Sequence, residues 1–524
     1  MDRAAAGVGR GAARFRCALG AAAARRGAAV NAWLPLMVLA SSLVPGMIIF
    51  MLPEKAVALR TTLNLGGAIL KIVLLVLMMI GVFHGVEYEF RLPLVPGLDF
   101  VLHADALSLM FVNLSAVLWL ATTVYAIGYL EGSPNRSRFF GYFSLCVTAT
   151  VGLAMAGNLL TFLVFYEALT LTTYPLVVHR GTEAARKAGR SYLAHTLFGG
   201  VLLLAGTVWL YSLTGTLEFV DRGFIAGRGI DPDVLRMIFV VLILGVGVKA
   251  AILPLHGWLP QAMVAPAPVS ALLHAVAVVK AGAFGIVRIV YDVFGIEFAA
   301  SLGVTLPLAI LAAVTIIYAS VRALFQDDLK RRLAFSTVSQ VSYITLGVAI
   351  AGPIATIGGL VHLVHQGFMK ITLFFCAGNF AETLGVHKVS EMRGIGRRMP
   401  WTMGAFTLAA FGMIGAPPMV GFISKWYLGL GALEVGQDWA VLVLAGSSLL
   451  NAAYFLPILR TAWFDPPPES WPEERSFGRK ETAWALLIPP VMTAAATLVW
   501  GLFASMPGTP LDWVQFIAAR KYAP

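Results

Sequence analysis

Charged side chains interrupt several segments of this sequence that are otherwise apolar. Lys249 lies in the run 237–254, which is long enough to cross a bilayer. An ammonium group costs free energy in hydrocarbon, so an ionisable residue inside a membrane segment is a candidate functional residue. Similar positions are held by Glu167, Lys280, Lys370 and Lys425, with His195, His274, His362 and His365 near them. A set of titratable groups inside a membrane predicts a protein that moves protons.

Glu167 and Lys249 are candidates for a switchable ion pair. Burial disfavours the charged form of both a carboxyl and an amino group, and a pair across neighbouring helices would offset both penalties. A proton or another charge brought to the pair would weaken it and change the proton affinity of the lysine. A static ion pair with a structural role is the alternative interpretation.

Prolines follow Lys249 in the segment Pro254–Pro260. They free backbone groups, which need water or polar side chains at membrane depth, so a hydrated break here would suit a proton path. His256 lies in this segment, either as part of the path or as a residue at the membrane interface. His274 and Lys280 follow in the next apolar segment, six residues apart and therefore offset around a helix.

His362 and His365 are three residues apart, so a helix places them on one face. A neutral imidazole accepts at one nitrogen and donates from the other, so the pair could relay protons together with Lys370. Metal binding would require further ligands, and no carboxylate or third histidine stands close by in the sequence. A hydrogen-bonded core histidine remains the alternative for each.

Lys425 follows Pro417–Pro418 and ends this series of charges. The alternative is a lysine that snorkels beside an interfacial Trp426. Lys71 and Arg288 lie near the ends of apolar segments, and we interpret both as residues close to the membrane interface.

The composition is that of a polytopic membrane protein. Of 524 residues, 59% are hydrophobic and only 12% are charged, whereas a soluble domain has about 25% charged residues. Cys17, Cys146 and Cys376 are too few and too scattered for a disulfide framework, a zinc site or an iron–sulfur cluster. No Walker loop or dinucleotide fingerprint is present in a strand–helix context, so we expect no cofactor and no metal site. The net charge of +11 reflects basic loops on one membrane face rather than nucleic-acid binding.

Membrane helices must position the charged residues, and the expected fold is all-α. A spanning helix needs about 20 mostly apolar residues, and about fourteen segments meet this measure. They lie near residues 32–52, 66–84, 106–129, 139–156, 158–178, 192–214, 236–254, 266–294, 301–323, 334–351, 354–382, 400–430, 437–463 and 483–505. The prolines predict that the seventh and twelfth helices are broken.

Basic residues are concentrated in alternate loops, and acidic residues in the loops between them. The basic loops include Lys55, Arg136, Arg186, Lys330 and Arg397, and the acidic loops include Glu87, Asp231 and Asp438. The basic loops are expected to be cytoplasmic, with both termini outside, in the inner membrane of a bacterial or archaeal cell. Residues 1–31 form a basic extension that conflicts with this orientation, and a wrongly assigned start or a non-native extension would explain it.

The chain also has a weak internal repeat. Lys249 and Lys425, each beside a proline break, are 176 residues apart, and His195 and His365 are 170 residues apart. Paired interrupted helices in corresponding halves indicate the pathway of a transporter.

Several motifs together resemble the antiporter-like family shared by Mrp multisubunit cation/proton antiporters and the proton-pumping subunits of respiratory complex I. They are the segments 165–169, 248–260, 268–274, 328–340 and 416–426. The resemblance covers about residues 32–465 and is greatest to the D-type subunits of the Mrp antiporters. The motif around His274 departs from this pattern, because it is similar to subunits with a histidine-bearing eighth helix.

The resemblance implies a subunit of fourteen helices with two inverted five-helix repeats. The implied divisions are N-terminal helices at 32–130, a first repeat at 139–294, a second repeat at 301–463 and a C-terminal loop and helix at 464–524. It also implies a polar axis with a glutamate on the fifth helix and lysines on the seventh, eighth and twelfth. These roles match Glu167, Lys249, Lys280 and Lys425.

We therefore predict a proton-translocating subunit of a multisubunit Na⁺/proton antiporter, with other membrane subunits, protons, Na⁺ and lipid as its partners. Glu167 would hold or release Lys249, and Lys425 would pass protons to the far side. The expected relay consists of His195, His256, His274, His362, His365 and Lys370. A redox-driven pump related to complex I or membrane-bound hydrogenase, and an inorganic-carbon uptake complex, are the alternatives. Only a redox-driven complex would make the chain part of an enzyme.

Overall fold

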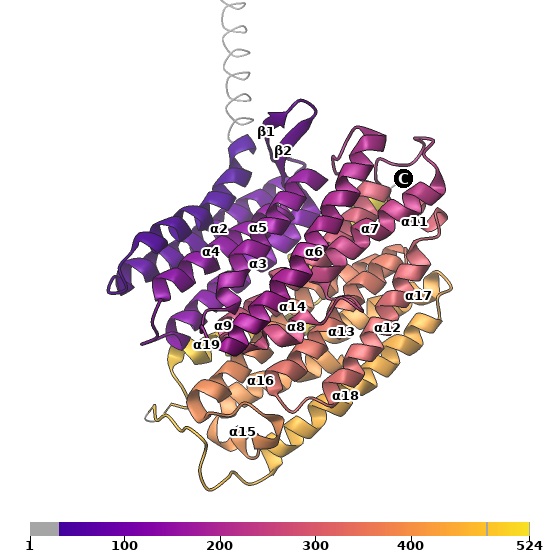
Figure 1. The fold of residues 1–524 in the computed structure, drawn as a ribbon. Coiled ribbons are helices and arrows are strands. Elements are labelled where there is room, and N and C mark those ends of the chain that lie inside the picture. The colour runs from indigo at the N-terminus through magenta and orange to yellow at the C-terminus, as the bar shows by residue number, and fades with distance from the viewer. Residues whose placement is uncertain (1–30, 478–479, 523–524) are drawn as a thin grey trace, which may run out of the picture.

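The computed structural model describes residues 31–477 and 480–522, and most of them are helical (Figure 1). In lipid a helix satisfies its own backbone hydrogen bonds, which is why long apolar segments adopt this structure. The basic extension predicted for residues 1–31 lies outside the described residues except for Asn31.

The helices of the first part of the chain are those at Asn31–Met51, α2 (Val57–Phe83), α3 (Ala106–Tyr129), α4 (Arg136–Ala154), α5 (Leu159–Val177), α6 (Glu183–Thr214), α7 (Pro232–Ala250), α8 (Trp258–Gln261), η1 (Ala262–Val264), α9 (Ala267–Ala275), α10 (Val278–Arg288), the π-helix η2 (Ile289–Phe294) and α11 (Ile296–Ser301). Those of the second part are α12 (Thr305–Leu324), α13 (Leu329–Ala349), α14 (Pro353–Leu384), η3 (Val389–Glu391), α15 (Ile395–Arg398), α16 (Pro400–Ile414), α17 (Val420–Glu434), α18 (Trp439–Phe464), α19 (Trp484–Leu502) and α20 (Pro510–Tyr522).

Each predicted span coincides with one helix or with consecutive helices. Within the described residues, 10 helices are long and apolar enough to cross a membrane by length and composition. The remaining predicted spans are more polar or are interrupted: α7 carries Asp233, Arg236 and Lys249, and α16 stops after 15 residues.

The breaks predicted at the two proline positions are confirmed. The helix α7 ends at Ala250, and Ala251 adopts a left-handed conformation with φ of 56° before the chain turns toward α8. The helix α16 ends at Ile414, Gly415 has φ of 90°, and α17 begins at Val420. A third break, at Val276–Ala277 between α9 and α10, is not marked by the sequence.

The loops lie mainly at two opposite ends of the bundle (Figure 1). At one end lies a hairpin of the antiparallel strands β1 (Glu89–Val95) and β2 (Leu98–His103), which the sequence did not predict. The backbone there is joined by hydrogen bonds from His103 to Met155 and from Leu159 to Leu217.

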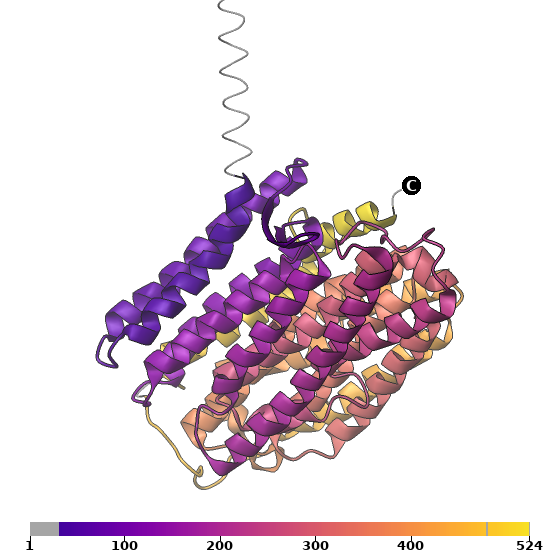
Figure 2. The same ribbon diagram turned by 45° about the horizontal axis from the view of Figure 1, so that its top comes forward.

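At the other end the basic loops meet, with hydrogen bonds from Leu329 to His387 and from Val389 to Asp327. The terminal helix α20 lies across the end that carries the hairpin (Figure 2). We call this the hairpin face and the opposite one the basic face.

Candidate functional site

Lys249 lies in the last turn of α7, fully buried. Its ammonium group donates to the backbone carbonyl of Tyr166 on α5 and lies 3.5 Å from the centroid of the Tyr166 ring. The Tyr166 hydroxyl donates to the Gly245 carbonyl at 2.8 Å, which ties the ring to α7. A carbonyl and an aromatic face therefore hold this cation, and both partners are neutral.

Glu167 follows Tyr166 on α5 and points toward α6. One carboxylate oxygen is buried without a hydrogen-bond partner, and a Cβ at Gly200 would lie 1.8 Å from it. Glycine is therefore required at position 200 for the carboxylate to stay where it is. The expected ion pair is not formed in this structure, because the Lys249 ammonium is bound to the Tyr166 carbonyl rather than to Glu167.

Lys425 on α17 is held by the end of the broken helix before it. Its ammonium group donates to the carbonyls of Ile414 and Met413 at 2.7 and 3.1 Å, and to Ser448 Oγ at 2.8 Å. The last carbonyls of a helix have no intrahelical donor and carry partial negative charge. The break at Gly415 therefore creates the binding site of the lysine, and the alternative of snorkelling beside Trp426 does not occur.

Lys280 and His274 are fully buried on either side of the break between α9 and α10. The Lys280 ammonium and both His274 ring nitrogens have no hydrogen-bond partner among the described residues. The His274 ring stacks on Phe374, with centroids 4.5 Å apart. Unpartnered polar groups at this depth need water or each other, and a water chain here would serve proton transfer.

His362 and His365 lie on α14, both buried. The Nδ1 atom of His362 is 2.8 Å from the Oγ atom of Ser424, which directly precedes Lys425 in the sequence. The Nε2 atom of His362 and the Nδ1 atom of His365 are buried without partners in the described part of the chain. Each ring therefore has a nitrogen free to accept or donate a proton.

Lys370, fully buried on α14, begins a hydrogen-bonded chain toward Lys425. Its ammonium donates to Ser336 Oγ at 2.7 Å, and the Tyr454 hydroxyl lies 2.8 Å from the same oxygen. Tyr454 also bonds Asn451, whose amide donates to the Met413 carbonyl that receives Lys425. An amide and a backbone carbonyl carry no readily transferable proton, so this chain positions the two lysines rather than conducting between them.

Sequence reasoning missed Ser336, Tyr454 and Asn451. They are uncharged, and Tyr454 is 118 residues from Ser336, so no local pattern joins them.

The remaining relay candidates lie toward the break after α7. His195 on α6 bonds the Ser191 carbonyl through Nδ1 at 2.8 Å and is half-buried. Its Nε2 atom lies 3.8 Å from the position of a Cβ at Gly257. His256 is half-buried in the break, with its ring 5.3 Å from that of Tyr318. These two histidines thus lie at the same break.

A polar cavity of about 360 Å³ opens beside this break on the basic face. It is lined in part by Arg180, Gln261, Ala267, Lys330 and His387. The Lys330 ammonium donates to the Ala265 carbonyl at 2.8 Å, which satisfies backbone freed by the break. A cavity of this size beside the segment between α7 and α9 has room for water.

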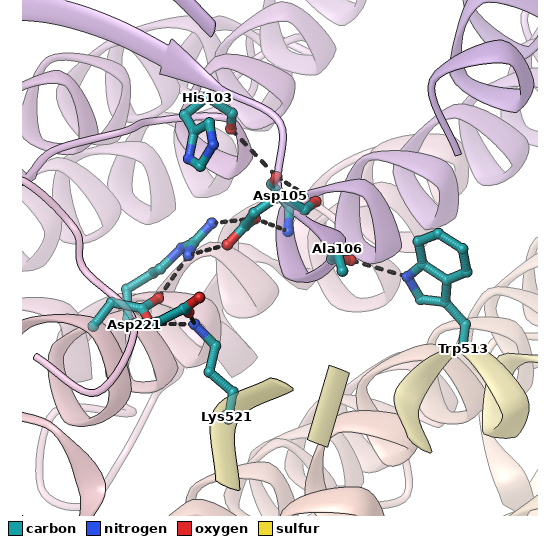
Figure 3. Close-up of polar contacts among 9 residues, drawn as sticks. His103, Asp105, Ala106, Asp221, Trp513 and Lys521 are labelled. Carbon is teal, nitrogen blue, oxygen red and sulfur yellow. Dashed lines mark hydrogen bonds and ion pairs between the residues drawn. The ribbon is translucent and has the colours of Figure 1, made fainter. Parts of the chain in front are cut away.

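One interpretation from the sequence is wrong. Lys71 does not lie at an interface: α2 begins fourteen residues earlier, at Val57, and Lys71 is fully buried with its ammonium 2.6 Å from Ser42 Oγ. Arg288 lies at the end of α10, as the sequence predicts, and it is buried there in ion pairs with Asp105 at 2.8 Å and Asp292 at 2.6 Å (Figure 3).

Asp105 is the N-cap of α3 and accepts from the Ser108 backbone amide. Burial alone would raise the pKa of its carboxyl, but the Arg288 guanidinium outweighs burial and holds that pKa well below its usual range. Asp105 is therefore charged at every physiological pH. Across residues 31–477 and 480–522 no group of three or more His, Cys, Asp or Glu residues could hold a metal ion.

The helices and buried cations define a multi-pass membrane protein with ionisable groups in its interior. The family described as "NADH:quinone oxidoreductase/Mrp antiporter, TM" matches residues 156–451, more than half of the chain. The chain belongs to this family and is an antiporter-like membrane subunit.

The chain is similar to subunits of two kinds of complex. The N-type subunit of the NADH-quinone oxidoreductase of Desulforudis audaxviator is 38% identical over 419 residues, covering 78% of this chain and 82% of the relative. The D-type subunit of the Na(+)/H(+) antiporter of Alkalihalophilus pseudofirmus is 27% identical over 411 residues, covering 78% and 81%.

The fold is also similar to a solved structure, that of the Mrp complex from Dietzia sp. DQ12-45-1b. The TM-score is 0.83 at 22% identity, and the match covers 94% of this chain and 98% of the other. At this level of identity the likeness concerns the fold.

Proposed function

We propose that this chain is the proton-translocating subunit of a multisubunit Na⁺/proton antiporter. The observation that carries the proposal is the burial of Lys249, Lys280 and Lys370, each without a carboxylate as a hydrogen-bond partner. A buried ammonium group with neutral partners is free to lose its proton, whereas one locked to a carboxylate is not.

The path begins at the basic face, in the cavity beside the break after α7. Protons reach Lys249 and Lys280 there, with His195, His256 and His274 as relay groups. They continue through His362, His365 and Lys370 to Lys425. The contact of His362 with Ser424, which directly precedes Lys425, supports this order in the second half.

Glu167 controls whether Lys249 keeps or releases its proton. Its unpartnered oxygen lies next to the residue whose carbonyl holds the Lys249 ammonium. When Lys249 moves from the Tyr166 carbonyl to the Glu167 carboxylate, its charged form is stabilised and the proton is retained. When Lys249 returns to the carbonyl, the proton is released more easily.

The overall arrangement that supports this path is one of fourteen helices in two inverted five-helix repeats, at 139–294 and 301–463. The corresponding breaks after Lys249 and before Lys425 favour it, as does the separation of basic and acidic loops onto two faces. By the positive-inside rule the basic face is cytoplasmic and the hairpin face lies outside, in the inner membrane of a bacterium or archaeon.

A redox-driven pump is the second candidate function, favoured by the 38% identity to an NADH-quinone oxidoreductase subunit. The same proton path would serve either complex, because the energy source lies in partner subunits. Purification of the complex from native membranes decides between them. Small membrane subunits and Na⁺-dependent proton transport in liposomes are expected. Iron–sulfur or hydrogenase subunits, with no response to Na⁺, would overturn the antiporter assignment.

A further inference from the structure

A cluster of charges on the hairpin face takes no part in the path above. Arg288 at the end of α10 contacts both Asp105 oxygens and Asp292 of η2. The Lys521 ammonium of α20 bonds Asp292 and Asp221 (Figure 3). The side chains of Arg288, Asp292 and Lys521 are almost completely buried. The cluster therefore ties the last helix to the first turn of α3 and to the end of α10.

The residue after Lys521 makes a second link. The Tyr522 hydroxyl lies 2.8 Å from Thr356 Oγ1 on α14, and the Tyr291 hydroxyl of η2 bonds the same oxygen. Thr356 is six residues before His362 on α14. Tyr291 continues the helical segment that carries Lys280. Lys521 and Tyr522 thus join the end of the first proposed repeat to the beginning of a helix in the second.

The strap formed by α20 is anchored at its other end as well. The Trp513 indole donates to the Ala106 carbonyl at the start of α3, at 2.9 Å (Figure 3). The helix is therefore fixed at both ends across the hairpin face.

We infer that Lys521 and Tyr522 are positioning residues, which hold the α10–η2 segment against α14 so that Lys280 and the α14 histidines keep their mutual geometry. The inference rests on the proposed function, because it assumes that Lys280 and His362 act on one path.

The charge cluster holds the α10–η2 segment in place and does not carry protons. Burial lowers the pKa of Lys521, but Asp292, Asp105 and Asp221 together outweigh burial and Arg288, and the pKa is raised. The pKa of Asp105 is lowered, as described above. Between pH values of about 5 and 9 both groups therefore stay charged. The ion pairs of the charge cluster therefore persist throughout this pH range.

The test compares Lys521→Met with Lys521→Arg in the whole purified complex. Lys521→Met removes the charge and frees Asp221, whereas Lys521→Arg keeps a cation within reach of both carboxylates. Tyr522→Phe separately removes the hydroxyl at Thr356. Lys187→Met, at an exposed lysine on α6, is the matched control.

Hydrogen exchange is read at residues 289–294 and in the first turn of α14, and proton transport is measured in liposomes. We expect Lys521→Met to speed exchange at both places and to slow transport about tenfold. Lys521→Arg should restore both, Tyr522→Phe should affect only the α14 turn, and Lys187→Met should affect neither.

Unchanged hydrogen exchange in assembled Lys521→Met complexes would show that Lys521 does not hold the α10–η2 segment against α14. Faster hydrogen exchange with normal proton transport would show that the contacts of Lys521 are not needed for the geometry between Lys280 and the α14 histidines. Glu167→Ala in the same assay tests the proposed function separately: transport that persists in that variant counts against the path, whatever Lys521→Met shows.

Discussion

Substituting Gly200 with alanine places a single methyl group against the proposed switch. The new Cβ would lie 1.8 Å from Glu167 Oε1, and ordinary contact begins at 3.4 Å. The carboxylate must therefore move by about 1.6 Å, the difference between these two distances. It can move, because the clash is with the end of a flexible and only half-buried side chain.

The effects on stability and on transport should differ in size. Alanine in place of glycine inside a helix favours folding by up to about 1 kcal/mol, so the complex should assemble and its melting temperature should not fall. A displacement of about 1 Å or more in a reacting group costs up to about 100-fold in rate. We expect proton transport to slow by between about 10-fold and 100-fold.

The assay is proton uptake into liposomes that contain the purified complex, reported by a pH-sensitive dye at equal subunit content. Gly66→Ala is the control, because a Cβ at that helical position meets nothing within 4 Å. Adding Glu167→Asp to Gly200→Ala shortens the acid and makes room for the methyl group, so transport should partly recover. Normal transport in Gly200→Ala would refute the claim that the position of this carboxylate matters.

Three further substitutions test other parts of the structure. Asn158→Ala removes the N-cap bond to the Thr161 amide at 2.8 Å and should lower thermal stability by about 1 kcal/mol; an unchanged melting temperature would contradict this. Gly282→Ala puts a Cβ 2.1 Å from the Ala250 backbone nitrogen, which cannot yield, so intact complex should be lost on size exclusion. Asp105→Asn should destabilise by about 3 kcal/mol. Because the folded pKa of Asp105 is lowered, its contribution is complete above pH values of about 4 and lost only below. The difference in melting temperature between Asp105→Asn and the unsubstituted protein should therefore be equal at pH 5 and pH 8. A smaller difference at pH 5 would contradict the lowered pKa of Asp105.

Hydropathy and proline positions predict the helical spans and two of the breaks, because both follow from local backbone chemistry. The third break, at Val276–Ala277, has no proline or other breaker in the sequence to mark it. The hairpin was missed for a related reason: Pro93 lies inside β1 and weakens the strand pattern.

The environment of each charge depends on tertiary packing and could not be predicted. The sequence suggests an interface for Lys71 because Arg60 and Asn64 make the first turns of α2 polar, so the apolar segment starts later than the helix. Arg288 meets Asp105 from 183 residues away. The residue types of the proposed path are visible in the sequence, but the carbonyls that hold Lys249 and Lys425 are not.

In the proposed mechanism, protons cross the membrane along these buried residues under the control of Glu167. Glu167→Ala and Glu87→Ala complexes, the latter changing a glutamate beside the hairpin, should be purified with equal subunit content and compared for Na⁺-dependent proton transport. We expect Glu167→Ala to abolish transport and Glu87→Ala to leave it unchanged. Unchanged transport in correctly assembled Glu167→Ala complexes would contradict it.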